Sequence, residues 1–231
     1  MTGGGVNEYG TAEALAADLA SGIAAALADA VARRGHATAA LAGGSTPRRM
    51  FEALSKADID WRRVTILPVD ERWVPETHER SNARLIADHL LKNRAREAGF
   101  VSLHAPTATP EDGMAEVAAR LRALSLPFDV VVLGMGTDGH TASFFPGGDN
   151  LARALDPDTA ELVVPMRAPG AGEPRSTLTL PPIRAARSLV LHIEGEEKRE
   201  VLMQARTGTD VKEMPVRAVL DAAHLKTVWA P

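Results

Sequence analysis

The chain has 231 residues, 45% hydrophobic and 24% charged as in an ordinary globular protein, and its net charge of −4 argues against a nucleic-acid partner. It has no cysteine, which excludes disulfides, thiol nucleophiles and zinc–thiolate sites. The first ten residues lack the basic and apolar regions of a signal peptide, and no segment reaches the roughly 18 apolar residues that span a bilayer, so we expect a cytoplasmic protein without a membrane partner.

Apolar periodicity and turn residues predict alternating helices and strands along the chain. In the first half of the chain, we predict helices over residues 11–34, 48–56 and 110–124, a helix after Ser81-Asn82 that reaches residue 91, and strands over 37–41 and 64–69. In the second half, we predict strands over 130–133, 162–164, 177–180, 189–193 and 226–229. The helices of the second half are a short one from Pro181-Pro182 and those over 194–205 and 215–223.

This alternation predicts a mainly parallel sheet with helices on both faces. We therefore expect an α/β protein with a three-layer αβα architecture and a Rossmann-like sheet, built as a single domain over residues 1–231. Ligands of open α/β sheets bind outside the carboxyl ends of the strands. The loops that follow the strands at 37–41, 64–69 and 130–133 should therefore meet in one crevice.

The first of these loops, Gly43-Gly44-Ser45-Thr46-Pro47, has the composition of an anion site. Glycines let the backbone approach a ligand, and free N–H groups at a helix N-terminus favour a phosphate. The loop is not a P-loop, because the ending GK[ST] is absent. A plain turn between strand and helix is the alternative that the sequence leaves open.

The second loop carries Asp70, Glu71 and Arg72 directly after a strand. A carboxylate pair and an arginine at this position can hold an anionic substrate and orient a nucleophile. The same residues can equally form an ion-pair network that closes the loop. Both interpretations stay open at this point.

The third loop follows the buried strand of FDVVVLGMGTDGHTASFFPG, residues 128–147. After a glycine-rich turn, His140 can act as a general base near neutral pH, and Asp138 can orient it. A lone histidine is more often a surface or core residue, so the loop alone leaves both roles open. Ser143 lacks the G-x-S-x-G context of a nucleophile, and the seven histidines of the chain show no metal-ligand spacing.

The chain contains LAGGSTPRRMFEAL, VDERWVPETHERSN, FDVVVLGMGTDGHTASFFPG, PRSTLTLPPIRAARSLVL and IEGEEKRE. In this order and spacing, which cover nearly the whole chain, the five segments resemble those of 6-phosphogluconolactonases. The wider superfamily includes glucosamine-6-phosphate deaminases, which share the GG[ST]P turn, the Asp-Glu pair after the strand and the G-x-D-G-H loop.

The resemblance implies hydrolysis of 6-phospho-D-glucono-1,5-lactone to 6-phospho-D-gluconate in the oxidative pentose phosphate pathway, without a metal or organic cofactor. It implies that His140 activates water for attack on C1 and that Asp138 orients the base or helps to position the sugar. The implied substrate-binding residues are Gly43, Gly44, Ser45, Thr46, Arg175 and Lys198 around the 6-phosphate, with Asp70 and Arg72 along the pocket and Arg72 touching phosphate or carboxylate.

Some of these residues also have structural interpretations. Arg175 could cap a strand, and Lys198 could pair on the surface with Glu196 or Glu197. Ser176 stands where the family usually has an apolar residue, which puts only local packing in doubt.

Two other functions compete with the lactonase. A deaminase of this superfamily has an acidic residue five positions after the histidine, where this chain has Phe145. A non-catalytic sugar-phosphate sensor would carry a DNA-binding segment ahead of the sugar domain, and we expect none to fit before Thr11. The oligomeric state is left open, with a monomer favoured.

Overall fold

Seven parallel strands form the central sheet of the structure, a computed structural model that describes residues 5–231. In spatial order the strands are β1 (Val6–Glu8), β10 (Leu225–Ala230), β9 (Ser188–Glu194), β6 (Val130–Leu133), β2 (Ala37–Leu41), β3 (Val64–Pro68) and β5 (Gly99–Phe100). The predicted mainly parallel α/β sheet is confirmed. Residues 1–4, which the single-domain prediction includes, lie outside the described residues, and that prediction stays a prediction.

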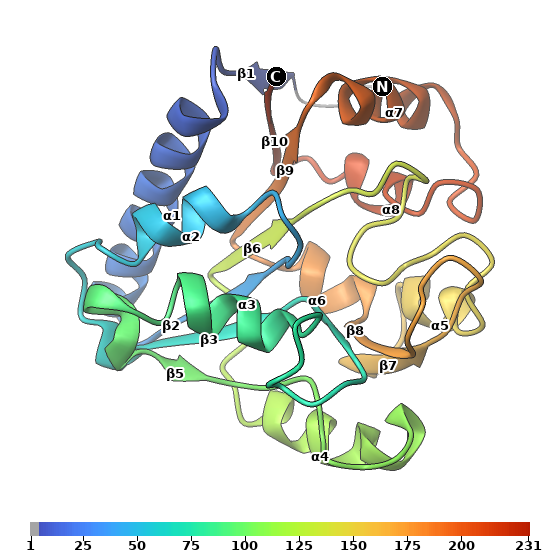
Figure 1. Cartoon of the computed structure of the whole chain (residues 1–231), viewed down its shortest axis with the longest axis horizontal. Coiled ribbons are helices and arrows are strands. Elements are labelled where there is room, and N and C mark those ends of the chain that lie inside the picture. The colour runs from blue at the N-terminus through green and yellow to red at the C-terminus, as the bar shows by residue number, and fades with distance from the viewer. Residues whose placement is uncertain (1–4) are drawn as a thin grey trace.

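Helices cover both faces of this sheet (Figure 1). One face packs against α1 (Ala12–Arg34), α2 (Arg48–Leu54), α3 (Asn82–His89) and the short 3₁₀ helices η1 (Trp61–Arg63) and η2 (Asn93–Glu97). The other packs against α4 (Pro110–Arg122), α5 (Leu151–Leu155), α6 (Leu180–Arg184), α7 (Glu196–Thr207) and α8 (Arg217–Leu220). Successive side chains of a strand point to opposite faces, so Val130 and Val132 enter the first core while Val131 and Leu133 enter the second.

Helix α1 is long and apolar enough to cross a membrane by length and composition, and it is the one such helix in the described part of the chain. Thr11 caps its start by accepting a hydrogen bond from the Ala14 backbone, and Gly35 ends it in the left-handed conformation. Its buried side chains pack in the core beneath the sheet; they are Leu15, Ala16, Leu19, Ala20, Ile23, Leu27 and Ala30. This packing accounts for the apolar composition of the helix.

A second, antiparallel sheet differs from the sequence prediction. Its strands lie in the order β4 (Asp70–Arg72), β8 (Arg175–Leu178) and β7 (Val163–Met166). The predicted loop at residues 70–72 is therefore a strand, and the strand predicted over 177–180 begins earlier, because the two segments pair with Arg72 opposite Arg175. Ser176 is fully buried there and donates a hydrogen bond to the Leu103 carbonyl oxygen at 2.6 Å, which satisfies its polar side chain.

Other differences lie at the ends of elements. The edge strand β1 and the short helix α5 were not predicted, and several predicted helices begin or end two or three residues away from the observed bounds. The effect on the site is small, because β2, β3 and β6 end close to the predicted positions. The loops that follow them leave the same edge of the parallel sheet.

Candidate active site

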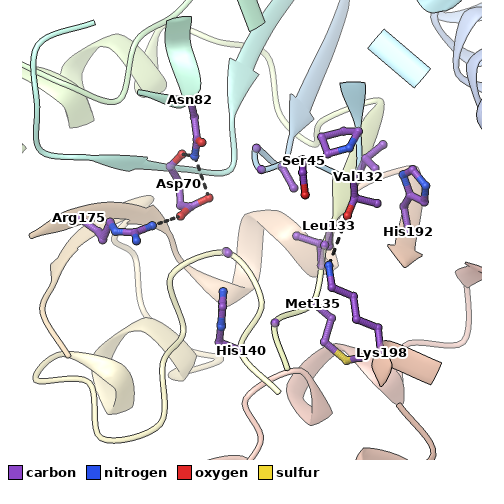
Figure 2. A pocket seen from close by; sticks show the side chains of 18 of the residues that line it. Ser45, Asp70, Asn82, Val132, Leu133, Met135, His140, Arg175, His192 and Lys198 are labelled. Atoms are coloured by element: carbon purple, nitrogen blue, oxygen red, sulfur yellow. Dashed lines mark hydrogen bonds and ion pairs between the residues drawn. The ribbon is translucent and has the colours of Figure 1, made fainter. Parts of the chain in front are cut away.

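A cavity of about 210 Å³ lies at the carboxyl ends of β2, β6 and β9, beside the small sheet (Figure 2). The residues that line it are Ala42, Gly43, Gly44, Ser45, Thr46, Pro47, Asp70, Arg72, Asn82, Val132, Leu133, Gly134, Met135, Gly136, His140, Ala142, Arg175, His192 and Lys198. The cavity thus brings together His140 and every substrate-binding residue that the sequence predicted. Asp138 contacts it through His140.

His140 and Asp138 form a close pair. The Nδ1 atom of His140 lies 2.5 Å from Oδ1 of Asp138, and the backbone N–H of His140 donates to the same oxygen at 3.1 Å. A carboxylate only accepts, so Nδ1 carries the proton and the lone pair is on Nε2. Burial of Asp138 opposes ionisation, but the hydrogen bonds from His140 hold the pKa of this carboxyl below its usual value. Within residues 5–231, Nε2 has no hydrogen-bond partner and is available to a ligand.

The loop that carries this pair depends on Gly136 and Gly139. A Cβ atom on Gly136 would lie 2.2 Å from Nδ1 and Cε1 of His140. Gly139 has a φ of 77° and lies against Met214, where a Cβ would come within 2.9 Å. The backbone of the loop closes on itself, because the Gly136 N–H donates to the carbonyl of His140 at 2.9 Å. These glycines therefore allow the imidazole to sit directly over its own loop.

Asp70 is buried, and its Oδ2 atom has two side-chain partners. Its Oδ2 accepts a hydrogen bond from the Ser143 hydroxyl at 2.6 Å and lies 3.5 Å from Nη1 of Arg175. Asn82 donates from Nδ2 to the Asp70 carbonyl at 2.7 Å. Three side chains therefore hold Asp70 at the wall of the cavity, and it is less available as a base than His140.

Glu71 does not line the cavity but closes the loop behind it. This fully buried carboxylate accepts hydrogen bonds from the backbone N–H groups of Arg72, Asn82 and Ala83 at 2.7 to 2.8 Å and from the Ser81 hydroxyl at 3.0 Å. Burial raises its pKa to about 7, although the four hydrogen bonds act in the opposite direction. Glu71 therefore closes the loop, but through hydrogen bonds rather than the expected ion pairs.

The glycine-rich turn and Lys198 form one end of the cavity. Gly43 lies so close to Asn82 that a Cβ atom would come within 1.9 Å of its side-chain oxygen. Lys198, near the start of α7, donates from Nζ to Thr46 Oγ1 at 3.3 Å (Figure 2). Burial lowers the pKa of Lys198, and nearby Glu194 opposes that shift. In the described structure Lys198 forms no ion pair on the surface, so the surface interpretation of this residue is wrong.

Arg175 lies on the other side of the cavity from Lys198 (Figure 2). Its buried side chain donates to the Ala171 carbonyl at 2.7 Å and faces Asp70, while its Nε atom has no partner among the residues described. Burial lowers the pKa of Arg175, against the opposing charge of Asp70. Arg175 and Lys198 therefore enter one cavity from two walls and share no contact.

The sequence analysis missed two polar residues of the cavity wall, Asn82 and His192. Asn82 was interpreted only as the start of a helix, whereas its side chain joins Asp70 to the glycine-rich turn. His192 was included in a predicted strand without a role. It is 2% exposed, and its Nε2 lies 3.1 Å from Glu194. A histidine inside a predicted buried strand was the available signal.

No group of three or more His, Cys, Asp or Glu side chains that could hold a metal ion occurs among residues 5–231. The chemistry that these residues offer is a paired imidazole with a free nitrogen, a hydroxyl-lined turn and several cations. Such an arrangement can activate water beside an anionic ligand.

Comparison with known proteins places the chain among sugar-phosphate enzymes. Residues 10–229 match the sequence model of the family described as glucosamine-6-phosphate isomerases/6-phosphogluconolactonase. The 6-phosphogluconolactonase of Rhizobium meliloti is 53% identical over 94% of this chain and 95% of its own length. That of Pseudomonas aeruginosa is 42% identical over 99% of this chain and 96% of its own.

The fold agrees with the same family. The crystal structure of a 6-phosphogluconolactonase from Shewanella baltica superposes with a TM-score of 0.96 and 42% sequence identity, and the match covers 100% of both chains. The family match spans the cavity, the His140 loop, the small sheet and the central sheet except β1 and the last residue of β10. The chain therefore belongs to the glucosamine-6-phosphate isomerase/6-phosphogluconolactonase family.

Proposed function

We propose that this protein hydrolyses 6-phospho-D-glucono-1,5-lactone to 6-phospho-D-gluconate, the reaction named for its relatives from Rhizobium meliloti and Pseudomonas aeruginosa. The observation that carries the proposal is the His140–Asp138 pair, whose unpartnered Nε2 faces a cavity that Lys198 and Thr46 make suitable for a phosphate. The reaction belongs to the oxidative pentose phosphate pathway.

His140 acts as the general base. Its Nε2 takes a proton from water as the water oxygen adds to C1 of the lactone, and Asp138 stabilises the imidazolium that forms. The tetrahedral intermediate then collapses, and the bond between C1 and the ring oxygen breaks. The imidazolium returns its proton to the departing ring oxygen, which becomes the hydroxyl on C5, and the product carboxyl ionises in solution. A lactone is an activated ester, so one positioned base suffices and no covalent nucleophile is needed.

The phosphate binds at the end formed by Gly43, Gly44, Ser45, Thr46 and Lys198. Backbone N–H groups of the turn, two hydroxyls and an ammonium group suit the three terminal oxygens of a phosphate. These contacts lie away from the reacting carbonyl, so they serve to align it with the base.

The opposite wall contributes charge and shape. Arg175 and Arg72 add positive potential that favours the phosphorylated substrate, and Asp70 offers acceptor oxygens to sugar hydroxyls. We include Arg175 with Lys198 among the residues that hold the phosphate through charge. All these residues come from one chain, so a monomer is sufficient, and we place the enzyme in the cytoplasm.

The test is lactone hydrolysis in mildly acidic buffer, where spontaneous ring opening is slow. Purified protein should accelerate the formation of 6-phosphogluconate far above the rate in buffer alone. A parallel reaction with glucosamine 6-phosphate, followed by ammonia release, should give no turnover. Ammonia release without lactone hydrolysis would replace the proposal with the deaminase, and tight binding of 6-phosphogluconate without any turnover would replace it with the sensor.

A further inference from the structure

Phe145 lies between the base and the arginine of the site. Its ring centroid is 4.4 Å from that of His140 at an interplanar angle of 35°, and the Cζ atom of Arg175 lies 5.4 Å from the same centroid. Phe145 is only 4% exposed and is not among the residues that line the cavity. Its ring therefore meets His140 from behind the cavity wall rather than from the substrate side.

The backbone after His140 turns back on itself, which brings the Phe145 ring against the imidazole. Ala142 has a positive φ of 48°, and the N–H of Phe144 donates to the Thr141 carbonyl at 2.9 Å. The Ser143 N–H is anchored on Thr177 Oγ1 of the small sheet at 3.3 Å. The chain thus turns tightly within five residues, which brings Phe145 against the histidine that precedes it.

The contact with Phe145 restricts a tilt of the His140 imidazole that its hydrogen bond to Asp138 still permits. One hydrogen bond at Nδ1 determines which edge of the imidazole faces the carboxylate, but the ring can still tilt about that edge. Packing of an aromatic ring against the imidazole limits this tilt, and tilted pairs at this separation are favourable. The direction of the Nε2 lone pair is therefore set jointly by Asp138 and Phe145.

The contact also affects charge. His140 becomes an imidazolium in each cycle of the proposed reaction, while Arg175 is charged throughout. The other charged groups of the cavity are Asp70, Arg72 and Lys198, and Asp138 is the one on the histidine's own loop. An aromatic face attracts cations, so the ring of Phe145 stabilises both the imidazolium and the guanidinium that flank it.

We propose that Phe145 is a positioning residue for His140, which holds the imidazole plane so that Nε2 points at the attacking water. The predicted effect of Phe145 on turnover rests on the proposed function. Its structural consequence, a single orientation of the His140 imidazole ring, does not depend on that function.

The experiment replaces Phe145 by Leu and uses Phe144→Leu as the matched control, since Phe144 is the adjacent phenylalanine, is fully buried and has no ring contact with His140 among the described residues. Phe145→Leu should lower kcat about tenfold with little change in KM, because displacement of a catalytic group by as much as 1 Å costs about 10²-fold. Phe144→Leu should keep kcat within about twofold of the wild type. Phe145→Tyr, which keeps the ring, should recover most of the lost kcat.

Two further readouts separate positioning from a general loss of structure. In a His140→Asn background, Phe145→Leu should cause no additional loss of turnover, because residues that act through one group are not additive. In NMR of His140, the wild type should show narrow imidazole resonances and Phe145→Leu broadened ones as the ring tilts, while Asp138 keeps the Nδ1–H tautomer in both proteins.

Equal losses of kcat in Phe144→Leu and Phe145→Leu would overturn the assignment, as would an undiminished effect of Phe145→Leu in the His140→Asn background. Unchanged imidazole line widths of His140 in Phe145→Leu would do the same. If the wild type failed to hydrolyse the lactone, the proposed function would be lost, yet the NMR comparison would still decide whether Phe145 orients the imidazole.

Discussion

Asp70 and Arg175 are 105 positions apart in the chain, yet Nη1 of the arginine lies 3.5 Å from Oδ2 of the carboxylate. Both side chains are nearly buried, and the pairing of β4 with β8 brings them together. Removing one partner of a buried pair leaves an uncompensated charge, so a substitution here affects the local structure as well as the ligand. Any test of Arg175 must separate the two effects.

Arg175→Ala should weaken the use of the phosphorylated lactone by about 1.5–3 kcal/mol in kcat/KM, the usual value of a hydrogen bond to a charged group. The measurement compares 6-phosphogluconolactone with unphosphorylated gluconolactone. The second substrate should be poor for the wild type and little changed by the substitution. Equal losses on both substrates would mean that Arg175 only maintains the position of Asp70. Lys198→Met provides the comparison from the opposite wall. It should also weaken the use of the phosphorylated lactone and leave the unphosphorylated one little changed, without disturbing Asp70.

His140→Asn should reduce turnover by roughly 10²–10⁴-fold, because asparagine keeps some shape and hydrogen bonding but cannot accept a proton at neutral pH. The fold and the binding of 6-phosphogluconate should be retained, as circular dichroism and calorimetry would show. If His140→Asn kept near-normal turnover while Asp70→Asn abolished it, the base would have to be reassigned to Asp70.

Lactonase activity should persist in an excess of chelator. The reason is that a water-activating imidazole is sufficient, and the described residues offer no cluster that could hold a metal ion. Initial rates measured before and after extended dialysis against EDTA provide the check. A loss of activity that a divalent ion restores would contradict the cofactor-free mechanism.

Stability should decrease as the pH rises from about 4.5 to about 7 through the titration of Glu71. Burial raises the pKa of this carboxyl to about 7 in the folded protein, so the folded state retains a proton that the unfolded state releases. The stability contributed by the neutral form is complete below the unfolded pKa and is lost as the pH passes the folded pKa. The upper limit is about 3 kcal/mol, from 1.36 kcal/mol for each pKa unit.

Denaturant unfolding of the wild type and Glu71→Gln across this pH range tests the point. The difference in unfolding free energy between the two proteins should change with pH in favour of the variant as the pH rises. The absolute stability of Glu71→Gln should be lower at acidic pH, because an amide cannot accept all four hydrogen bonds that Glu71 receives. A pH-independent difference would show that the pKa of Glu71 is the same in the folded and unfolded states, so that its hydrogen bonds balance its burial.

The order of the elements, the mainly parallel sheet and the three loops at its carboxyl edge are all predictable from the sequence. These features are encoded locally: apolar runs such as 130–133 mark buried strands, and glycines mark the turns that follow. Parallel strands then bring successive loops to one edge without further information. For this reason the sequence alone predicts that the glycine-rich turn and His140 share one crevice.

The tertiary structure decided which side chains meet. Arg175 and Lys198 line one cavity, as expected, but only the tertiary structure shows that β8 carries the arginine to Asp70 while α7 carries the lysine to Thr46. The antiparallel pairing of β4 with β8 left no local pattern, because residues so far apart are joined only when the chain closes around the core. The contact of Phe145 with His140 depends in the same way on a turn anchored on the small sheet. The hydrophobic pattern of the sequence indicates which segments are buried and where the chain turns. Which side chains touch each other depends on how segments far apart in the chain pack together.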